Sequence, residues 1–392
     1  MPDLWYKLLS QLCAGCYFSR VEVLPARPRL HGPTLLVALH RNGAVDGWVY
    51  KSVFPSAIFL IAAQLRKNLL ARLFFTGISV VRDKDDGDRS ANAESMERCQ
   101  QLLASGGVLA IFPEGTSSLG PRHLPFKSGA ARIAHEACQR NLPLTLLPLG
   151  ITYDAPSTFR SRVQVICGSP LTLPSNCSLS LADLKHELSR RLESVGVNVD
   201  SEDHYRDIRA LASFVSPEIP YHYALKALEP AIPATLQPAW LALRETLAAH
   251  LLLYPEKSPF SPQSPFFTLL AALLLGPFVL IAAVLNAPPL LAAFLAGRKF
   301  PDGPNVITLW RILVGAPPLV LWLLILLMLV LVFKFILFFL AYLALSLLGL
   351  FAYAPCKQHL RHSLNALRFP SLRLTYLHFR FTLLQELRSH AS

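Results

Sequence analysis

The stretch that decides the fold is VLAIFPEGTSS, residues 108–118, in which an apolar run passes directly into a polar loop. A short apolar run bounded by turn residues is typical of a buried strand. Similar runs on either side alternate with helical patterns, which indicates a sheet flanked by helices. The predicted strands are 34–39, 57–62, 78–81, 108–112, 144–153 and 163–167, and the predicted helices are 91–104, 129–140 and 180–195. We therefore predict an α/β domain with a mixed sheet over residues 34–200.

The composition indicates that part of the chain lies in lipid. The 392 residues are 53% hydrophobic and 16% charged, with a mean hydropathy of +0.40, which excludes a disordered chain and an ordinary soluble enzyme. Of the formal net charge of +12, residues 261–392 supply ten Lys and Arg against two acids. Basic residues beside apolar runs favour a membrane surface over a nucleic-acid groove. We expect a lipid bilayer as a partner and no nucleic acid, and the oligomeric state stays open.

Two long apolar segments follow a proline- and serine-rich linker at residues 258–262. The first, residues 266–296, carries no charge, and its Asn-Ala-Pro-Pro break at 286–289 favours a re-entrant or interfacial element. The second, residues 312–354, is divided by Lys334 into stretches of 22 and 20 residues, each long enough to cross a hydrocarbon core. We expect a tight turn at Lys334, and one long buried helix is the alternative.

Basic residues flank these segments in the loop 297–311 and in the tail after residue 354, and by the positive-inside rule both face the cytoplasm. We expect an integral protein of a bacterial inner membrane or an endomembrane, with its catalytic domain in the cytoplasm. The other predicted regions are an amphipathic N-terminal segment (1–33, with a helix over 4–18), a helical extension (201–260), membrane-embedded helices (261–354) and a basic amphipathic tail (355–392).

The seven cysteines do not form a metal-binding pattern. Their number is odd, and no second close pair completes a four-ligand zinc site with Cys13 and Cys16. We expect reduced thiols and no metal.

A histidine and an aspartate follow the first predicted strand. His40 leaves this strand into a glycine-containing loop, and Asp46 follows after five intervening residues. Such a loop can present a base together with the carboxylate that fixes its tautomer. The alternative is that His40 and Asp46 are structural residues that stand at this separation by chance. The pair becomes evidence for a catalytic site only together with the motifs that follow.

Basic side chains follow two other predicted strands. Arg82 ends one of them and could hold a phosphate bidentately, or it could pair with Asp83 or Asp85 at the surface. Arg122 and Lys127 follow the Pro-Glu-Gly-Thr loop, just before a predicted helix. Cations beside a helix N-terminus and a Gly/Ser/Thr loop make a competent anion site.

In this order and at these spacings, the segments resemble the glycerophosphate and lysophosphatidate acyltransferase family over residues 35–153, and Phe-Pro-Glu-Gly-Thr is the most specific part. The family's first block is usually His, four residues, Asp, whereas five residues separate His40 from Asp46. His40-x-Asn42 resembles a longer bacterial version of this block. Arg41 stands at the usual spacing, but its guanidinium cannot act as a base. The ITLWR pattern at 307–311 resembles the glycerol-3-phosphate and dihydroxyacetone-phosphate branch.

The resemblance implies acyl transfer from a thioester, acyl-CoA or acyl-ACP as co-substrate, to a hydroxyl of a glycerol phosphate acceptor, with no cofactor. It implies His40 as the base and Asp46 as the residue that orients it. The other implied roles are a phosphate grip by Arg82, Arg122 and Lys127 and an acceptor pocket shaped by Glu114, Gly115 and Thr116. No acyl-enzyme is required.

Glycerol 3-phosphate is the expected acceptor, with dihydroxyacetone phosphate and 1-acylglycerol 3-phosphate as alternatives. Two other classes stay open: a catalytically inactive lipid-binding or scaffold protein, and a membrane hydrolase using Ser117 or Ser128 with His40. The sequence contains no G-x-S-x-G elbow, which argues against the hydrolase.

Overall fold

The computed structural model describes residues 2–66, 69–81, 91–216, 218–250, 252 and 257–389. The chain forms two compact units. The first, here called the sheet unit, comprises Met1–Asn198 and Asp302–Leu309. The second, the helical unit, comprises Val199–Pro301 and Trp310–Ser392.

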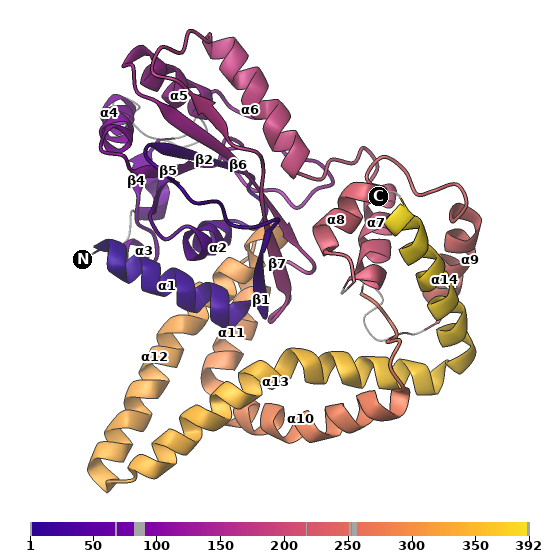
Figure 1. Ribbon diagram of the computed structural model, residues 1–392. Helices are drawn as coiled ribbons and strands as arrows, with labels where there is room; N and C mark the ends of the chain where they lie inside the picture. Colours follow the sequence, from indigo (N-terminus) through magenta and orange to yellow (C-terminus); the bar gives the residue numbers. More distant parts are fainter. Residues whose placement is uncertain are drawn as a thin grey trace. The chain divides into compact units, whose positions relative to one another are not determined.

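The sheet unit is built on an eight-stranded sheet in the order β1-β7-β6-β2-β5-β3-β4, with β8 paired to β6 (Figure 1). The strands are β1 (Arg20–Leu24), β2 (Thr34–Ala38), β3 (Ala57–Ala62), β4 (Ile78–Val80), β5 (Val108–Ile111), β6 (Leu144–Tyr153), β7 (Arg162–Cys167) and β8 (Leu171–Leu173). The pairs β6–β7 and β6–β8 are antiparallel, and the other pairs are parallel. The predicted mixed sheet is therefore confirmed.

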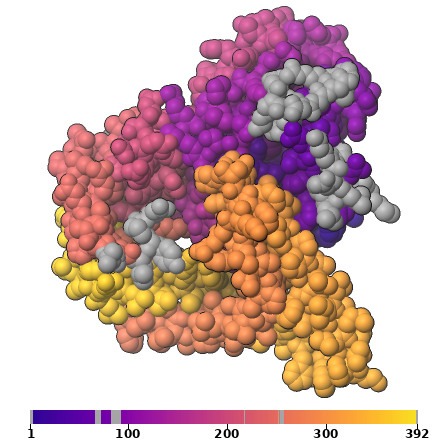
Figure 2. Space-filling view, turned by 180° about the vertical axis from the view of Figure 1, so that it is seen from behind, coloured from indigo at the N-terminus to yellow at the C-terminus, as the bar shows by residue number. Residues whose placement is uncertain are grey.

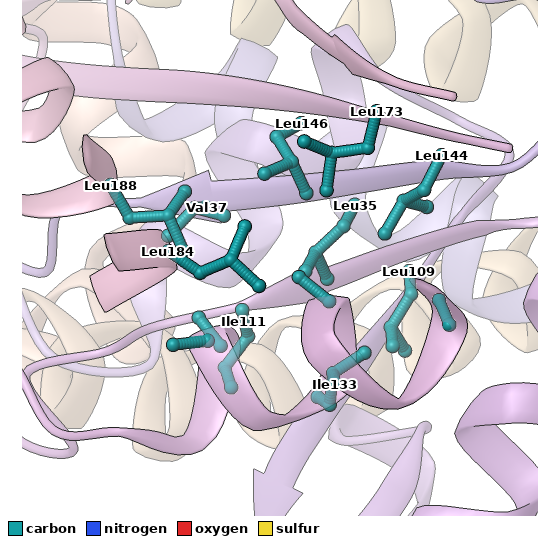
Figure 3. Packing of buried hydrophobic residues seen from close by; sticks show 14 of the residues in the cluster. Leu35, Val37, Leu109, Ile111, Ile133, Leu144, Leu146, Leu173, Leu184 and Leu188 are labelled. Carbon is teal, nitrogen blue, oxygen red and sulfur yellow. The ribbon is translucent and has the colours of Figure 1, made fainter. Parts of the chain in front are cut away.

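Helices cover the sheet because its central strands are apolar on both faces. The helices of this unit are α1 (Pro2–Tyr17), α2 (Val45–Val53), α3 (Leu69–Phe74), α4 (Ala91–Ala104), α5 (Gly129–Gln139) and α6 (Leu181–Val195), with a 3₁₀ turn at Ala63–Arg66. Leu35 of β2 and Leu109 of β5 pack with Ile133 of α5 and Leu184 of α6 in one buried cluster (Figure 3). Each fully buried leucine of this kind contributes about 1.5–3 kcal/mol.

The strand and helix predictions for this unit are confirmed with ends within one residue, apart from the first helix, whose ends differ by up to two. Ser180 caps α6 as expected: its hydroxyl accepts from the Asp183 amide, and the Asp183 side chain completes a capping box. Strands β1 and β8 and helices α2 and α3 lie outside the predicted set.

The helical unit contains α7 (Glu202–Val215), α8 (Tyr221–Leu228), α9 (Gln237–Ala249), α10 (Pro265–Leu285), α11 (Ala287–Lys299), most of α12 (Ile307–Phe333), α13 (Ile336–Arg368) and α14 (Pro370–Ser389). Within the described residues, three helical segments are long and apolar enough to cross a membrane, namely Pro265–Leu285, Pro304–Phe333 and Ile336–Arg368. Helices α10 and α13 run side by side (Figure 1).

The turn predicted at Lys334 is confirmed, because Lys334 stands between α12 and α13 with a φ of +58°. The apolar side chains of these two helices are largely exposed, and Figure 2 shows the orange surface that they form. Asn286 separates α10 from α11, where its amide donates to the Ser346 hydroxyl at 2.9 Å. Helix α13 continues past residue 354 without a break.

Candidate active site

Two loops meet at the carboxyl ends of β2 and β5, which are adjacent and parallel. His40 follows β2, and Glu114 follows β5. The Glu114 carboxylate accepts from the His40 backbone amide at 2.7 Å through Oε1 and from the Leu124 amide at 2.9 Å through Oε2. The Ser118 amide in turn donates to the His40 carbonyl at 3.2 Å. The two predicted motifs are therefore joined by the Glu114 side chain and by one backbone hydrogen bond.

His40 and Asp46 are in direct contact, with Nδ1 and Oδ2 2.8 Å apart. Asp46 lies in the first turn of α2 and is fully buried, while the imidazole keeps 15% of its surface and stacks on Phe112. Because the carboxylate accepts the Nδ1 proton, the neutral ring carries its lone pair on Nε2. The five-residue spacing thus allows a direct contact between the two side chains.

Three further donors fix the Asp46 carboxylate. The backbone amides of Arg41 and Asn42 donate to Oδ2 at 2.6 and 2.8 Å, and the Tyr153 hydroxyl donates to Oδ1 at 2.6 Å. Tyr153 ends β6, the strand next to β2, and is buried. Burial, and then the charge of Asp46, raise the pKa of Tyr153 well above its usual value, so the phenol stays a donor. The sequence carried no local signal for this role.

Arg41 holds the loop opposite His40. Its guanidinium donates to the carbonyls of Gly120 at 2.5 Å and Arg122 at 3.3 Å. The side chain is buried. This structural use agrees with its exclusion as a base.

Lys127 lies against Gly115 in the second loop. Gly115 has a φ of +70°, and a Cβ there would lie 3.3 Å from Cε and 3.5 Å from Nζ of Lys127. The Lys127 amide donates to the Pro113 carbonyl at 2.8 Å, two residues before α5 begins. An ammonium group beside a helix N-terminus and a glycine loop suits an anion.

The remaining predicted site residues take different positions. Thr116 is half-buried in the same loop, and Arg122 is exposed. Glu114 is 2% exposed, with both oxygens bound to backbone amides, and burial raises its pKa above the usual value. Its visible role is to join the two loops. Arg82 lies outside the described residues.

The described part of the chain contains no group of three or more His, Cys, Asp or Glu side chains placed to hold a metal ion.

Comparison with known proteins identifies the domain that carries this site. Residues 18–152 match the Acyltransferase family model. A probable 1-acyl-sn-glycerol-3-phosphate acyltransferase of Mycoplasma pneumoniae is 42% identical over 154 residues, which are 37% of this chain and 57% of the relative. Glycerol-3-phosphate O-acyltransferase 1 of Saccharomyces cerevisiae is 34% identical over 79 residues, 20% of this chain and 10% of the relative. The chain spans less than two thirds of the length of each of these curated relatives.

A solved structure, the 1-acyl-sn-glycerophosphate acyltransferase of Thermotoga maritima, aligns with a TM-score of 0.36 and 17% identity over 50% of this chain and 78% of that chain. The matched family region contains the His40–Asp46 pair and the loop from Glu114 to Lys127. Residues 18–152 therefore form an acyltransferase domain, and this region is similar to proteins named as 1-acylglycerol-3-phosphate and glycerol-3-phosphate acyltransferases.

Proposed function

We propose that the protein transfers a fatty acyl group from an acyl thioester, acyl-CoA or acyl-ACP, to a hydroxyl of glycerol 3-phosphate at the cytoplasmic face of a membrane. The observation that carries this proposal is the His40–Asp46 contact of 2.8 Å, in which Nε2 keeps the lone pair. The Gly115–Lys127 arrangement supplies an anion site in the adjoining loop.

The reaction follows from these groups. Nε2 of His40 takes the proton of the acceptor hydroxyl as its oxygen attacks the thioester carbonyl, and Asp46 stabilises the imidazolium that forms. The tetrahedral intermediate then collapses, the carbon–sulfur bond breaks, and the imidazolium returns the proton to the leaving thiolate. Atoms and charges balance without an acyl-enzyme or a cofactor.

The phosphate of the acceptor is assigned to Lys127, Arg122 and Arg82. A guanidinium or ammonium group forms a charge-assisted hydrogen bond with a phosphate oxygen, and such bonds are stronger than those between neutral groups. Gly115 and Thr116 are assigned to the wall of the acceptor pocket.

A second acceptor, 1-acylglycerol 3-phosphate, is supported by the name of the Mycoplasma relative. The match with this relative is longer than the match with the yeast relative and has the higher sequence identity. The ITLWR pattern at 307–311 supports glycerol 3-phosphate or dihydroxyacetone phosphate. We rank glycerol 3-phosphate first.

The test is product analysis with the purified full chain in detergent or vesicles. Glycerol 3-phosphate, dihydroxyacetone phosphate and 1-acylglycerol 3-phosphate are each supplied separately with a labelled acyl thioester. We expect acylated glycerol 3-phosphate as the product of the wild-type protein. His40→Ala should not form this product. His186→Ala is the control and should still form it, because His186 is an exposed residue of α6. Activity on 1-acylglycerol 3-phosphate alone would reverse the ranking. Free fatty acid as the main product would indicate a hydrolase. The absence of any product would indicate a catalytically inactive lipid-binding protein.

A further inference from the structure

A short segment from far along the chain lies on both catalytic loops. Residues 302–309, here called the strap, belong to the sheet unit although about a hundred residues separate them from Asn198. The strap contains the 3₁₀ turn Pro304–Val306 and the start of α12. The strap lies outside the matched family region, which ends at residue 152.

The first contact of the strap is with the loop that follows Glu114. The Asn305 side-chain amide donates to the Ser117 hydroxyl at 2.7 Å and to the Ser117 carbonyl at 3.2 Å. Ser117 follows Thr116 directly, and the next amide, that of Ser118, donates to the carbonyl of His40. Asn305 therefore holds the loop at the point where it meets the catalytic histidine.

The second contact is with the loop between His40 and Asp46. Gly43 lies between them with a φ of +57°, and a Cβ there would lie 3.0 Å from the Asn305 carbonyl oxygen and 3.3 Å from a methyl group of Val306. The absence of a side chain at this position lets the strap backbone approach the loop closely.

The third contact closes the network through Pro156. The Thr308 hydroxyl donates to the Pro156 carbonyl at 2.7 Å, and the Asn42 side-chain amide donates to the same carbonyl at 3.2 Å. Thr308 is fully buried, and its hydroxyl also lies 3.3 Å from that of Tyr17. The strap is thus anchored to the first catalytic loop through a shared acceptor as well as by direct packing.

We propose that the strap is a third wall of the acyltransferase site and that Asn305 is a positioning residue for acceptor binding. Through Ser117, Asn305 fixes the loop that contains Gly115 and Thr116. The inference rests on the proposed function for the identity of the acceptor, but not for the effect of Asn305 on the loop.

The test compares Asn305→Ala with Ser117→Ala, which removes part of the same contact from the other side, and with the double variant. A neutral hydrogen bond of this kind corresponds to about a 3- to 10-fold change. We expect each single variant to raise the KM for the acceptor by about that factor, with the KM for the thioester unchanged. The double variant should be no worse than Asn305→Ala, because the two residues act through one contact.

The matched control is Asn286→Ala, which removes an asparagine–serine hydrogen bond in the helical unit. It should leave the KM for the acceptor unchanged. An unchanged acceptor KM in Asn305→Ala, or an equal rise for acceptor and thioester, would overturn the positioning role.

A measurement without substrate separates this inference from the proposed function. Hydrogen exchange of the backbone amides at 115–120 should become faster in Asn305→Ala than in the wild-type protein and in Asn286→Ala. Unchanged exchange rules out the strap as a support of this loop, whatever the substrate is. Inactivity of the wild-type protein on every acceptor, together with faster exchange in Asn305→Ala, would refute the proposed function and leave the support by the strap standing.

Discussion

At the scale of single residues, hydrogen bonds fix the position of the Asp46 carboxylate. It is fully buried and accepts four hydrogen bonds, from His40, two backbone amides and Tyr153. A buried carboxylate keeps its charge only when donors replace its lost hydration. These donors also set its direction, so the imidazole has one orientation in which its Nδ1 proton is accepted.

We expect His40→Ala and Asp46→Asn to reduce kcat by about 10²- to 10⁴-fold, the usual cost of losing a general base or its orientation. Asp154→Asn is the matched control, since Asp154 also accepts a backbone amide in the sheet unit, that of Arg162. Steady-state kinetics on purified protein measure the effect. Near-normal turnover in His40→Ala would assign the base to another residue.

Tyr153→Phe tests the hydroxyl contact with Asp46. Without this donor the Asp46 carboxylate keeps three of its four hydrogen bonds and is held less firmly, so we expect kcat to fall about 3- to 10-fold. Because the pKa of Tyr153 is raised above its usual value, ionisation of this hydroxyl plays no part in the pH dependence of wild-type activity below about pH 10. Tyr50→Phe is the control, because that hydroxyl donates to the Leu39 carbonyl at 3.2 Å. An equal kcat in both variants would remove Tyr153 from the positioning of Asp46.

At the scale of elements, the site depends on loops held to one another rather than on strands alone. Parallel pairing brings the carboxyl ends of β2 and β5 to the same edge of the sheet. Glu114 then accepts from one backbone amide of each loop, that of His40 after β2 and that of Leu124 after β5. A buried acceptor with two amide donors is costly to remove, because the donors are left without partners.

Glu114→Ala should therefore lower both the melting temperature and kcat, with a smaller effect on the KM for the acceptor. Two orphaned amides correspond to about 2 kcal/mol or more in the free energy of unfolding. Thermal unfolding and kinetics on the same preparation measure both effects. A rise in acceptor KM without a loss of stability would instead support the pocket role predicted from the sequence.

Lys127→Ala should show the opposite pattern. A phosphate bound through the ground and transition states gives nearly uniform binding, so the KM for the acceptor should rise about 10-fold or more while kcat changes little. Kinetics with varied acceptor concentration decide the point. A collapse of kcat at constant KM would move Lys127 from phosphate binding to transition-state stabilisation.

The strands and the motifs could be predicted because local sequence patterns determine them. The residues that support the site through contacts distant in the sequence could not be predicted in this way. β2, β3 and β6 are nearly continuous apolar runs, but β1 is the edge strand RVEVL, with two charged residues, and its partner β7 lies about 140 residues away. His40, Asp46 and Glu114 stand in recognisable sequence motifs. Tyr153 and Asn305 have ordinary sequence neighbours, and their roles arise only from the pairing of β6 with β2 and from the return of the chain at the strap.

At the scale of the whole molecule, one chain combines an acyltransferase domain with helices suited to lipid. Helix α12 is 27 residues long, about 40 Å at 1.5 Å per residue, and it is apolar and long enough to cross a hydrocarbon core. An acyl chain is insoluble in water, so an enzyme that handles it gains from a membrane beside it.

A topology experiment tests the predicted orientation. If the sheet unit faces the cytoplasm, the turn between α12 and α13 lies on the opposite side of the membrane. We expect Lys334→Cys to react with a membrane-impermeant maleimide in intact cells. The wild-type protein, whose exposed Cys16 lies in the sheet unit, should react only after the cells are opened. Labelling of the wild-type protein in intact cells would reverse the orientation.

The return of the chain at residues 302–309 has a consequence for the order of synthesis. The ribosome completes His40, Asp46 and the whole sheet long before Asn305, and it makes α10 and α11 in between. A nascent chain therefore contains every strand of the sheet before it contains Asn305. With the strap as its proposed third wall, the site can be completed only after the apolar helices α10 and α11 have been synthesised.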